Sequence, residues 1–244
     1  MSNACAEKVR IGDPDRFLAV MAAPPGLRAG LFVLYAFNLE IARAPWVTEQ
    51  PLIAEMRLQW WLDVVAAPKA PAHEVAGPLH ALIVAKGLPV EVLDRLIAAR
   101  RWDCGREAHA DQAALDSYLE DTGAGLMWLA HLFCGGTDEA AARNAGWAAA
   151  LAAYLRAAPA LAAAGRVPLV DDGHEAIATL ARRGFDRLTQ ARGARGAALL
   201  AGWQAGPILR QVIRDPGAVA EGRLGLSEFR RRGRLLWCSL TGRP

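Results

Sequence analysis

The sequence predicts a single all-α domain, and its composition leads to that conclusion. Hydrophobic residues make up 53% of the 244 residues, with alanine in long runs and few clusters of valine, isoleucine or threonine, which favours helices over strands. The 23 glycines and 14 prolines mark the ends of these helices. A chain of this length can bury one sizeable core. We therefore expect one domain over residues 1–244, with a short N-terminal tail over about residues 1–12.

Three helices are expected in the N-terminal quarter of the chain. Asp13 followed by Pro14 is typical of an N-cap and a first helical position, so a short helix should begin there and end before the next pair of prolines. A second helix is expected over about residues 26–43. A third should begin at Pro51, because proline fits the first turn of a helix.

The second and third of these helices are expected to line an interior cavity. Apolar and polar side chains recur on them at spacings of three and four, which places them on one face of each helix. Trp61 is expected to point away from that face. A tryptophan pair on a helix can also be simple core, and a buried asparagine can bond a neighbouring helix instead of a ligand. The candidate cavity residues are Leu34, Tyr35, Asn38, Met56, Gln59 and Trp60.

Helical patterns continue through the remainder of the chain. Gly123 and Gly125 fall in the middle of one expected helix, where they would allow close helix packing. Thr137 is expected to be the N-cap of an alanine-rich helix that Pro159 kinks or ends. Further helices are expected over residues 78–86, 89–107, 111–134, 175–193, 195–214 and 227–240.

Charge and cysteine usage exclude several classes of protein. A formal net charge of +3 is too small to indicate nucleic-acid binding, because phosphate binding needs many basic groups on one surface. The four cysteines are far apart and form no C-x-x-C pair, so neither a zinc site nor a disulfide framework is expected. No secretory signal or membrane-spanning stretch is visible. We expect a cytoplasmic protein, with peripheral contact at the inner face of the membrane as a further option.

Two sequence motifs carry a family resemblance. The segment LYAFNLEIAR at residues 34–43, followed by RLQWW at residues 57–61, resembles the opening helices of the squalene/phytoene synthase family, the head-to-head prenyl synthases. The resemblance implies an isoprenoid-synthase-like helical bundle around a central cavity. It also implies two aspartate-rich motifs on facing helices, which hold Mg²⁺ against a prenyl diphosphate, because a hard cation needs several carboxylate oxygens.

Both aspartate-rich motifs are missing from this chain. When Tyr35, Ala36 and Phe37 are aligned on the family pattern, the first aspartate pair falls on Ala42 and Trp46. The second pair falls on Ala157 and Leu161. None of these side chains can bind a metal, so no cofactor is expected and no catalytic or metal-binding residue is assigned.

The resemblance then implies a binding protein more readily than an enzyme. The chain looks like a non-catalytic branch of the family, which includes the mitochondrial assembly factor for respiratory complex I. Its partner would be a protein in the assembly of a membrane complex, and its cavity would take an apolar or isoprenoid ligand. The alternative is a Mg²⁺-dependent prenyl transferase that condenses isoprenyl diphosphates through carboxylates placed elsewhere.

Acidic residues at helical spacing are the only reserve for that alternative. Asp103, Glu107 and Asp111 are four apart, and we interpret them as an exposed acidic helix face beside arginines. The reserve ligands for Mg²⁺ are Asp116, Glu120 and Asp121.

The one dense basic cluster lies near the C-terminus. Arginines with a nearby tryptophan on a helix are candidates for contact with an anionic membrane surface. A docked helix with a solvated arginine face explains the same pattern. The candidate membrane residues are Arg230, Arg231, Arg232, Arg234 and Trp237.

Overall fold

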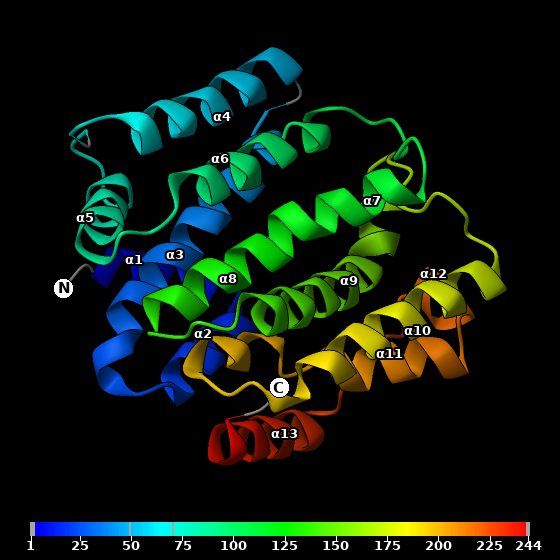
Figure 1. Ribbon diagram of the computed structural model, residues 1–244. Helices are drawn as coiled ribbons and strands as arrows, with labels where there is room; N and C mark the ends of the chain where they lie inside the picture. The colour runs from blue at the N-terminus through cyan, green and yellow to red at the C-terminus, as the bar shows by residue number, and fades with distance from the viewer. Residues whose placement is uncertain (1–2, 49, 70, 243–244) are drawn as a thin grey trace.

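Helices form the whole regular structure of the protein (Figure 1). The computed structural model describes residues 3–48, 50–69 and 71–242, and within these ranges it has no β-strand, which confirms the all-α prediction. None of the helices in these ranges is long and apolar enough to cross a membrane. The α-helices are α1 (Asn3–Gly12), α2 (Pro14–Ala22), α3 (Pro25–Arg43), α4 (Pro51–Ala66), α5 (Ala76–Lys86), α6 (Val90–Ala99), α7 (Gln112–Leu119), α8 (Gly125–Phe133), α9 (Glu139–Ala163), α10 (His174–Gln190), α11 (Ala205–Arg214), α12 (Gly217–Ala220) and α13 (Glu228–Thr241).

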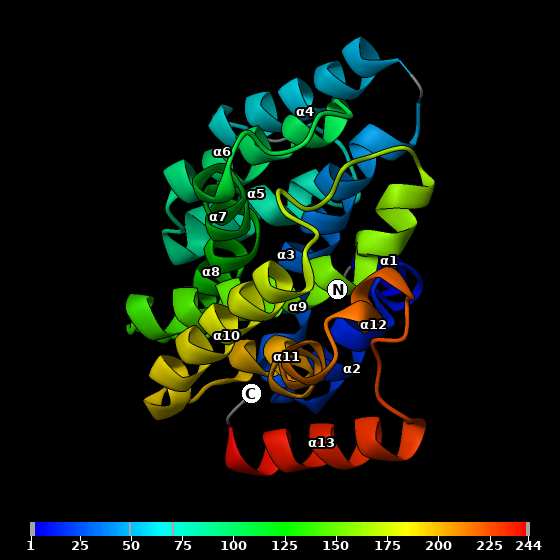
Figure 2. The same cartoon turned by 90° about the vertical axis from the view of Figure 1, so that its right-hand side faces the viewer.

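Short 3₁₀ or π segments connect several of these helices. They are η1 (Ala44–Trp46), η2 (Trp102–Cys104), η3 (Glu120–Ala124), η4 (Ala191–Gly193) and η5 (Ala197–Gly202). The segment η3 is a π turn that joins α7 to α8 without a break. Helix α4 and helix α13 lie at opposite ends of the molecule, as Figures 1 and 2 both show.

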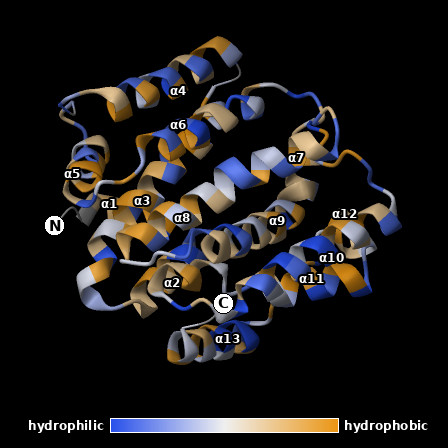
Figure 3. Cartoon of the chain, in the orientation of Figure 1, coloured by the Kyte–Doolittle hydropathy of each residue, from blue (hydrophilic) through white to orange (hydrophobic). Residues whose placement is uncertain are grey.

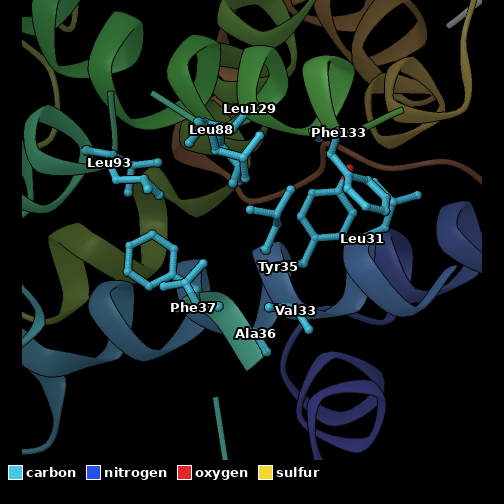
Figure 4. Close-up of a cluster of buried hydrophobic side chains, with 14 of the residues drawn as sticks. Leu31, Val33, Tyr35, Ala36, Phe37, Leu88, Leu93, Leu129 and Phe133 are labelled. Carbon is cyan, nitrogen blue, oxygen red and sulfur yellow. The ribbon is translucent and has the colours of Figure 1, made fainter. Parts of the chain in front are cut away.

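Helix α3 lies at the centre of the largest hydrophobic core. Ten of its residues, all between Gly30 and Ile41, are buried. In Figure 4, Leu31 and Tyr35 of α3 lie close to Phe133 of α8. A Cβ atom on Gly30 would lie 2.2 Å from the ring of Phe133, so the ring occupies the space that a side chain at position 30 would need. This packing fixes α3 against α8.

Glycines bring the α7–α8 segment close to α9. A Cβ atom on Gly123 would lie 2.1 Å from the Cβ of Ala150, and one on Gly146 would lie 2.5 Å from the Cβ of Met127. The close packing predicted for the glycines of this region is therefore present at Gly123, and Gly146 of α9 provides the matching space on the other helix.

Replacing Gly146 with alanine is expected to lower the free energy of unfolding by about 1 to 3 kcal/mol, because overpacking forces the backbones apart. The new methyl group would meet backbone atoms of Gly123 and Ala124 within 3 Å, and those atoms cannot rotate away. Urea denaturation measures the change. The matched control is Gly77→Ala in α5, where nothing lies within 4 Å of the added Cβ. That control should be neutral or slightly stabilising, and equal effects at both positions would contradict the packing argument.

Residues 3–12 of the expected N-terminal tail form a packed helix, and residues 1–2 lie outside the described residues. In α1, Cys5 and Val9 are buried against the main core. Lys8 pairs with Glu40 of α3 at 2.6 Å and with Glu74 at 2.8 Å. The buried residues are four apart, so one face of α1 contributes to the core.

The prediction of which face of α4 is buried is wrong. Met56 is 64% exposed, whereas Trp61 is 4% exposed and its ring lies 5.3 Å from that of Phe37. The buried positions of α4 also include Ala54 and Leu58. Apolar residues occur at helical spacing on both sides of this helix, so the pattern alone did not select the buried side.

Three other boundaries differ from the prediction. The helix expected over residues 89–107 ends at Ala99, and η2 and an irregular segment follow. The N-cap of α9 is Asp138, whose carboxylate accepts a hydrogen bond from the Ala141 amide at 3.0 Å, and not Thr137. Pro159 lies inside α9, which continues to Ala163, so of the two predicted effects of this proline the helix end is wrong and the kink stays a prediction.

Candidate functional site

A cavity of about 340 Å³ lies between α3 and α9, beside the α7–α8 segment. Its size is within the range of small-molecule sites. Along α9 it is bordered by small side chains, those of Ala149, Ala150, Ala153 and Ala157. Across from them α3 contributes Tyr35. The alanines leave room beside the helix that larger side chains would fill, so the alanine-rich sequence of α9 is what creates this space.

All four positions on which the sequence alignment places the family's aspartates border this cavity. Ala42 and Trp46 contribute from α3 and η1, and Ala157 and Leu161 contribute from α9. The guanidinium of Arg166 lies 4.3 Å from the centre of the Trp46 ring. At the positions where the sequence alignment expects carboxylates, the cavity is bordered by methyl, isobutyl and indole groups, and a cation lies against the indole of Trp46.

A buried polar cluster lies in the cavity wall. The Nη1 of Arg100 donates hydrogen bonds to Asp103 at 3.2 Å and to the Tyr118 hydroxyl at 2.7 Å. The Tyr118 hydroxyl donates to the Asp103 carboxylate at 3.0 Å. Asp103 is only 7% exposed, so the exposed acidic face predicted for Asp103, Glu107 and Asp111 is wrong for Asp103, whereas the other two are exposed. The helix containing it was expected to continue, but it ends at Ala99, and η2 turns the side chain inward.

His109 lies behind this cluster. Its ring stacks on Trp102 with centroids 3.7 Å apart, and its Nε2 lies 3.4 Å from the Tyr154 hydroxyl. That hydroxyl also donates to the Pro168 carbonyl at 2.7 Å. Burial lowers the pKa of His109 to about 4, and burial raises the pKa values of Tyr118 and Tyr154. At neutral pH these three rings are therefore uncharged, and the only charges of the cluster are those of Arg100 and Asp103.

The depressed pKa of His109 predicts a loss of stability in acid. The folded protein holds the pKa at about 4, below the ordinary value of 6.5, so between these values the unfolded chain binds the proton more tightly. Lowering the pH from 7 to 4.5 should cost about 2 kcal/mol of unfolding free energy through this residue. Urea denaturation across this range should show that His109→Phe loses less stability than the wild type. Parallel curves for the two proteins would contradict the assignment.

Two polar atoms in the cavity wall have no hydrogen-bond partner among the described residues. They are Oδ1 of Asn38 and Nε of Arg100. Both side chains border the cavity, and Asn38 is only 5% exposed. The sequence analysis allowed a hydrogen bond from Asn38 to a neighbouring helix as an alternative to a ligand. Oδ1 of Asn38 makes no such bond with the described residues. A buried amide oxygen without a donor costs free energy, so the cavity wall retains polar groups able to bond a ligand or water.

The other candidate cavity residues lie elsewhere. Leu34 of α3 is fully buried in the main hydrophobic core, and Met56 of α4 is exposed. Gln59 bonds Asp63 at 3.0 Å and Arg101 at 2.8 Å. Trp60 borders a separate hollow of about 270 Å³, beside Trp61 and His73. The cavity residues that sequence reasoning missed include Arg100, Asp103 and Tyr118.

The reserve carboxylates are all engaged with arginines. Asp116 pairs with Arg183. Glu120 accepts from Arg187 at 2.9 Å, and Asp121 lies 3.6 Å from Arg95. In the ranges that the structure describes, no three acidic, histidine or cysteine side chains form a cluster that could hold a metal ion. Among the described residues, the one carboxylate that borders the cavity is Asp103, and it is bonded to Arg100 and Tyr118. These residues do not fit a Mg²⁺–diphosphate site.

The C-terminal candidates divide into two groups. Arg230, Arg232 and Trp237 are exposed on α13. Arg231 pairs with Asp15 of α2 and with Glu228, so its guanidinium already has two protein partners, and its contact with a membrane stays a prediction. Nε of Arg234 donates to the Trp203 carbonyl at 3.2 Å and partly anchors the helix.

Comparison with known proteins places this geometry in a family. The family model described as squalene/phytoene synthase matches residues 9–176, which is more than half of the chain. The chain belongs to the squalene/phytoene synthase family. Two solved structures are similar to it in fold. They are a dehydrosqualene synthase in complex with ligand, and squalene synthase HpnC from Alicyclobacillus acidocaldarius.

The fold is preserved although the sequences have diverged. The dehydrosqualene synthase has a TM-score of 0.81 at 13% identity, with 98% of this chain and 95% of that chain covered. The squalene synthase has a TM-score of 0.61 at 16% identity, with 99% and 94% covered. The central cavity of this squalene/phytoene synthase family member is thus set in the helical fold of those proteins.

The curated relatives of this family member are named as assembly factors and not as synthases. Complex I assembly factor 6 of Bos taurus is 28% identical over 161 residues, and that of Homo sapiens is 27% identical over 161 residues. The matches cover 64% of this chain and 48% of each relative. The Drosophila melanogaster homologue is 29% identical over 170 residues, covering 64% of the chain and 50% of the relative. The chain therefore spans about half the length of these curated relatives.

Proposed function

We propose that this squalene/phytoene synthase family member is a non-catalytic binding or assembly factor. One observation carries the proposal: the four positions that should hold a metal–diphosphate complex border the cavity as Ala42, Trp46, Ala157 and Leu161. Ionisation of a prenyl diphosphate requires Mg²⁺ to neutralise the leaving group, and these side chains offer no oxygen ligand. The role we assign is therefore recognition and not turnover, and we assign it no metal or other cofactor.

The relatives support an assembly role for this protein. They are named as assembly factors of NADH dehydrogenase (ubiquinone) complex I, and they share about 27% identity with the chain over 161 residues. We propose that the partner is a protein of this membrane complex during its assembly. The place of action would be the cytoplasmic side, at the inner face of the membrane, with the protein bound peripherally.

The cavity supports a ligand-binding role beside the protein contact. Its alanine wall fits an apolar chain, and an isoprenoid is the ligand class that the shared fold suggests. Asn38 Oδ1 and Arg100 Nε could bond a polar end of that ligand, because neither has a partner among the described residues. The alternative of a Mg²⁺-dependent prenyl transferase has the fold in its favour but no free carboxylate at the cavity.

Deletion of the gene tests the assembly role. We expect less assembled complex I on native gels and lower rotenone-sensitive NADH oxidation, both restored by a wild-type copy. The variant Ala153→Trp, which fills the cavity from α9, tests whether the role needs the cavity; a folded variant that restores assembly would assign the role to the protein surface alone. Normal amounts of assembled complex in the deletion strain would overturn the proposal.

A further inference from the structure

A basic groove lies between α11 and α13, far from the central cavity. It has a volume of about 470 Å³. Helix α11 contributes Arg210 and Arg214, and helix α13 contributes Arg230 and Arg234. Of these residues, Arg210 and Arg234 also border a neighbouring hollow of about 220 Å³ together with Arg192. Segments far apart in the sequence thus bring five arginines to one edge of the molecule.

The charge of this groove is not compensated within the described part of the chain. None of the five arginines makes an ion pair with a carboxylate there. By contrast, nearby Arg231 and Arg223 each pair with two carboxylates. Partial burial and the like charges of Arg234, Arg192 and Arg214 lower the pKa of Arg210. With a formal net charge of only +3 for the chain, this concentration of unpaired cations marks an anion-binding edge.

An exposed apolar stripe lies directly beside the groove on α13. Phe229 is 88% exposed, Leu240 is 77% exposed, and Leu236 and Trp237 are each 61% exposed. Their spacing places them on one side of the helix. The opposite side of α13 packs on the protein through Cys238, which is fully buried. Figure 2 shows α13 lying lengthwise along the edge of the molecule, and Figure 3 shows hydrophobic and hydrophilic residues along it.

We propose that the α11–α13 edge docks on an anionic phospholipid bilayer, with lipid phosphates in the arginine groove and the α13 stripe inserted among the acyl chains. The inference deepens the proposed role beside a membrane and rests on it. Helical spacing puts Arg230 and Arg232 on either side of the stripe, so arginines would reach headgroup depth while Phe229, Leu236 and Leu240 enter the bilayer. Trp237 belongs to the stripe and also borders the groove, which would place it at the headgroup depth where tryptophan is enriched.

Charge and shape favour a bilayer over other occupants. A second copy of this chain would bring the same unpaired arginines together, and like charges would oppose that contact. A bilayer supplies both phosphates and an apolar phase along the whole length of a helix, and the stripe extends from residue 229 to residue 240. An acidic protein partner would satisfy the arginines but is a separate outcome of the test.

Co-sedimentation of the full chain with vesicles tests the proposal. We expect binding to vesicles of phosphatidylcholine with 30% phosphatidylglycerol, weaker binding in 0.5 M NaCl, and none to pure phosphatidylcholine. Arg214→Gln with Arg230→Gln should weaken partitioning about 30-fold, since each surface arginine contributes about fivefold. Neither side chain makes a hydrogen bond or ion pair with a described residue, so folding should be unaffected. Phe229→Ser with Leu240→Ser should reduce binding at all salt concentrations.

The matched control is Arg43→Gln with Arg57→Gln at the opposite end of the molecule. It removes the same charge and should leave vesicle binding within about twofold of the wild type, because these positions are far from the membrane surface. Equal losses in both double variants would show a non-specific charge effect and overturn the site. Absence of binding to anionic vesicles would overturn the proposed membrane-docking surface. An acidic protein would then be the partner to test for the α11–α13 edge. Prenyl diphosphate turnover and complex I assembly are separate readouts, so failure here is distinguishable from failure of the proposed function.

Discussion

Replacing Asp103 with alanine is expected to lower the free energy of unfolding by about 3 to 5 kcal/mol, because it leaves the Arg100 charge buried without its partner. Only 17% of the Arg100 side chain and 9% of the Asp103 side chain are exposed. The Tyr118 hydroxyl cannot replace the carboxylate, since it already accepts from Arg100 at 2.7 Å and carries no charge. The loss should be large for a single substitution.

Urea denaturation of three variants separates this effect from a general loss of charge. Asp172→Ala removes an exposed acid from a loop and should change the stability by less than about 0.5 kcal/mol. Tyr118→Phe removes one hydroxyl and should cost about 1 to 2 kcal/mol. If Asp103→Ala costs less than Tyr118→Phe, the ion pair does not stabilise this end of the cavity.

Placing carboxylates at the positions that the sequence alignment matches to the family's aspartates should create a response to Mg²⁺ that we do not expect in the wild type. The variant carries Ala42→Asp, Ala157→Asp and Leu161→Asp, which put three acids around one cavity. In EDTA these like charges should destabilise the protein. With saturating Mg²⁺ at about 100 times the dissociation constant, the variant should regain about 2 to 3 kcal/mol. Thermal denaturation with and without the ion measures the difference.

The control for this experiment places acids on the same helix outside the cavity. Ala160→Asp with Ala164→Asp keeps the spacing of four, at the last turn of α9 and its C-cap, and neither position borders the cavity. This variant and the wild type should show the same melting temperature in Mg²⁺ and in EDTA. A Mg²⁺-dependent rise in the wild type would reveal a metal site in the native chain.

The sequence predicted structure well for a helix that is buried in the centre of the core. Helix α3 is buried over most of its length, so its start, its end and the position of Asn38 on the cavity were predictable from spacing and proline placement. Helix α4 shows the opposite case. Its apolar residues occur on both sides, and only the packing of Trp61 against Phe37 decides which side is buried. Periodicity cannot supply that information.

The polar cluster of the cavity could not be predicted for a different reason. Arg100 and Asp103 are three residues apart, at the end of α6 and in η2, but Tyr118 of α7 lies 15 residues beyond Asp103, and no local spacing joins it to them. The regular acidic spacing at Asp103 suggested a continuing helix, which the structure replaces with a turn. Arg231 is a similar case, since its partner Asp15 lies 216 residues away in the sequence. Contacts of this range become visible only once the helices are placed.

The central claim is that this squalene/phytoene synthase fold has kept a cavity without the diphosphate chemistry. Incubation of the purified protein with farnesyl diphosphate and with geranylgeranyl diphosphate, each with Mg²⁺, tests it most directly through release of pyrophosphate. We predict release no faster than in buffer alone, because Ala42, Trp46, Ala157 and Leu161 offer no metal ligand at the cavity. Turnover that EDTA abolishes would contradict the account.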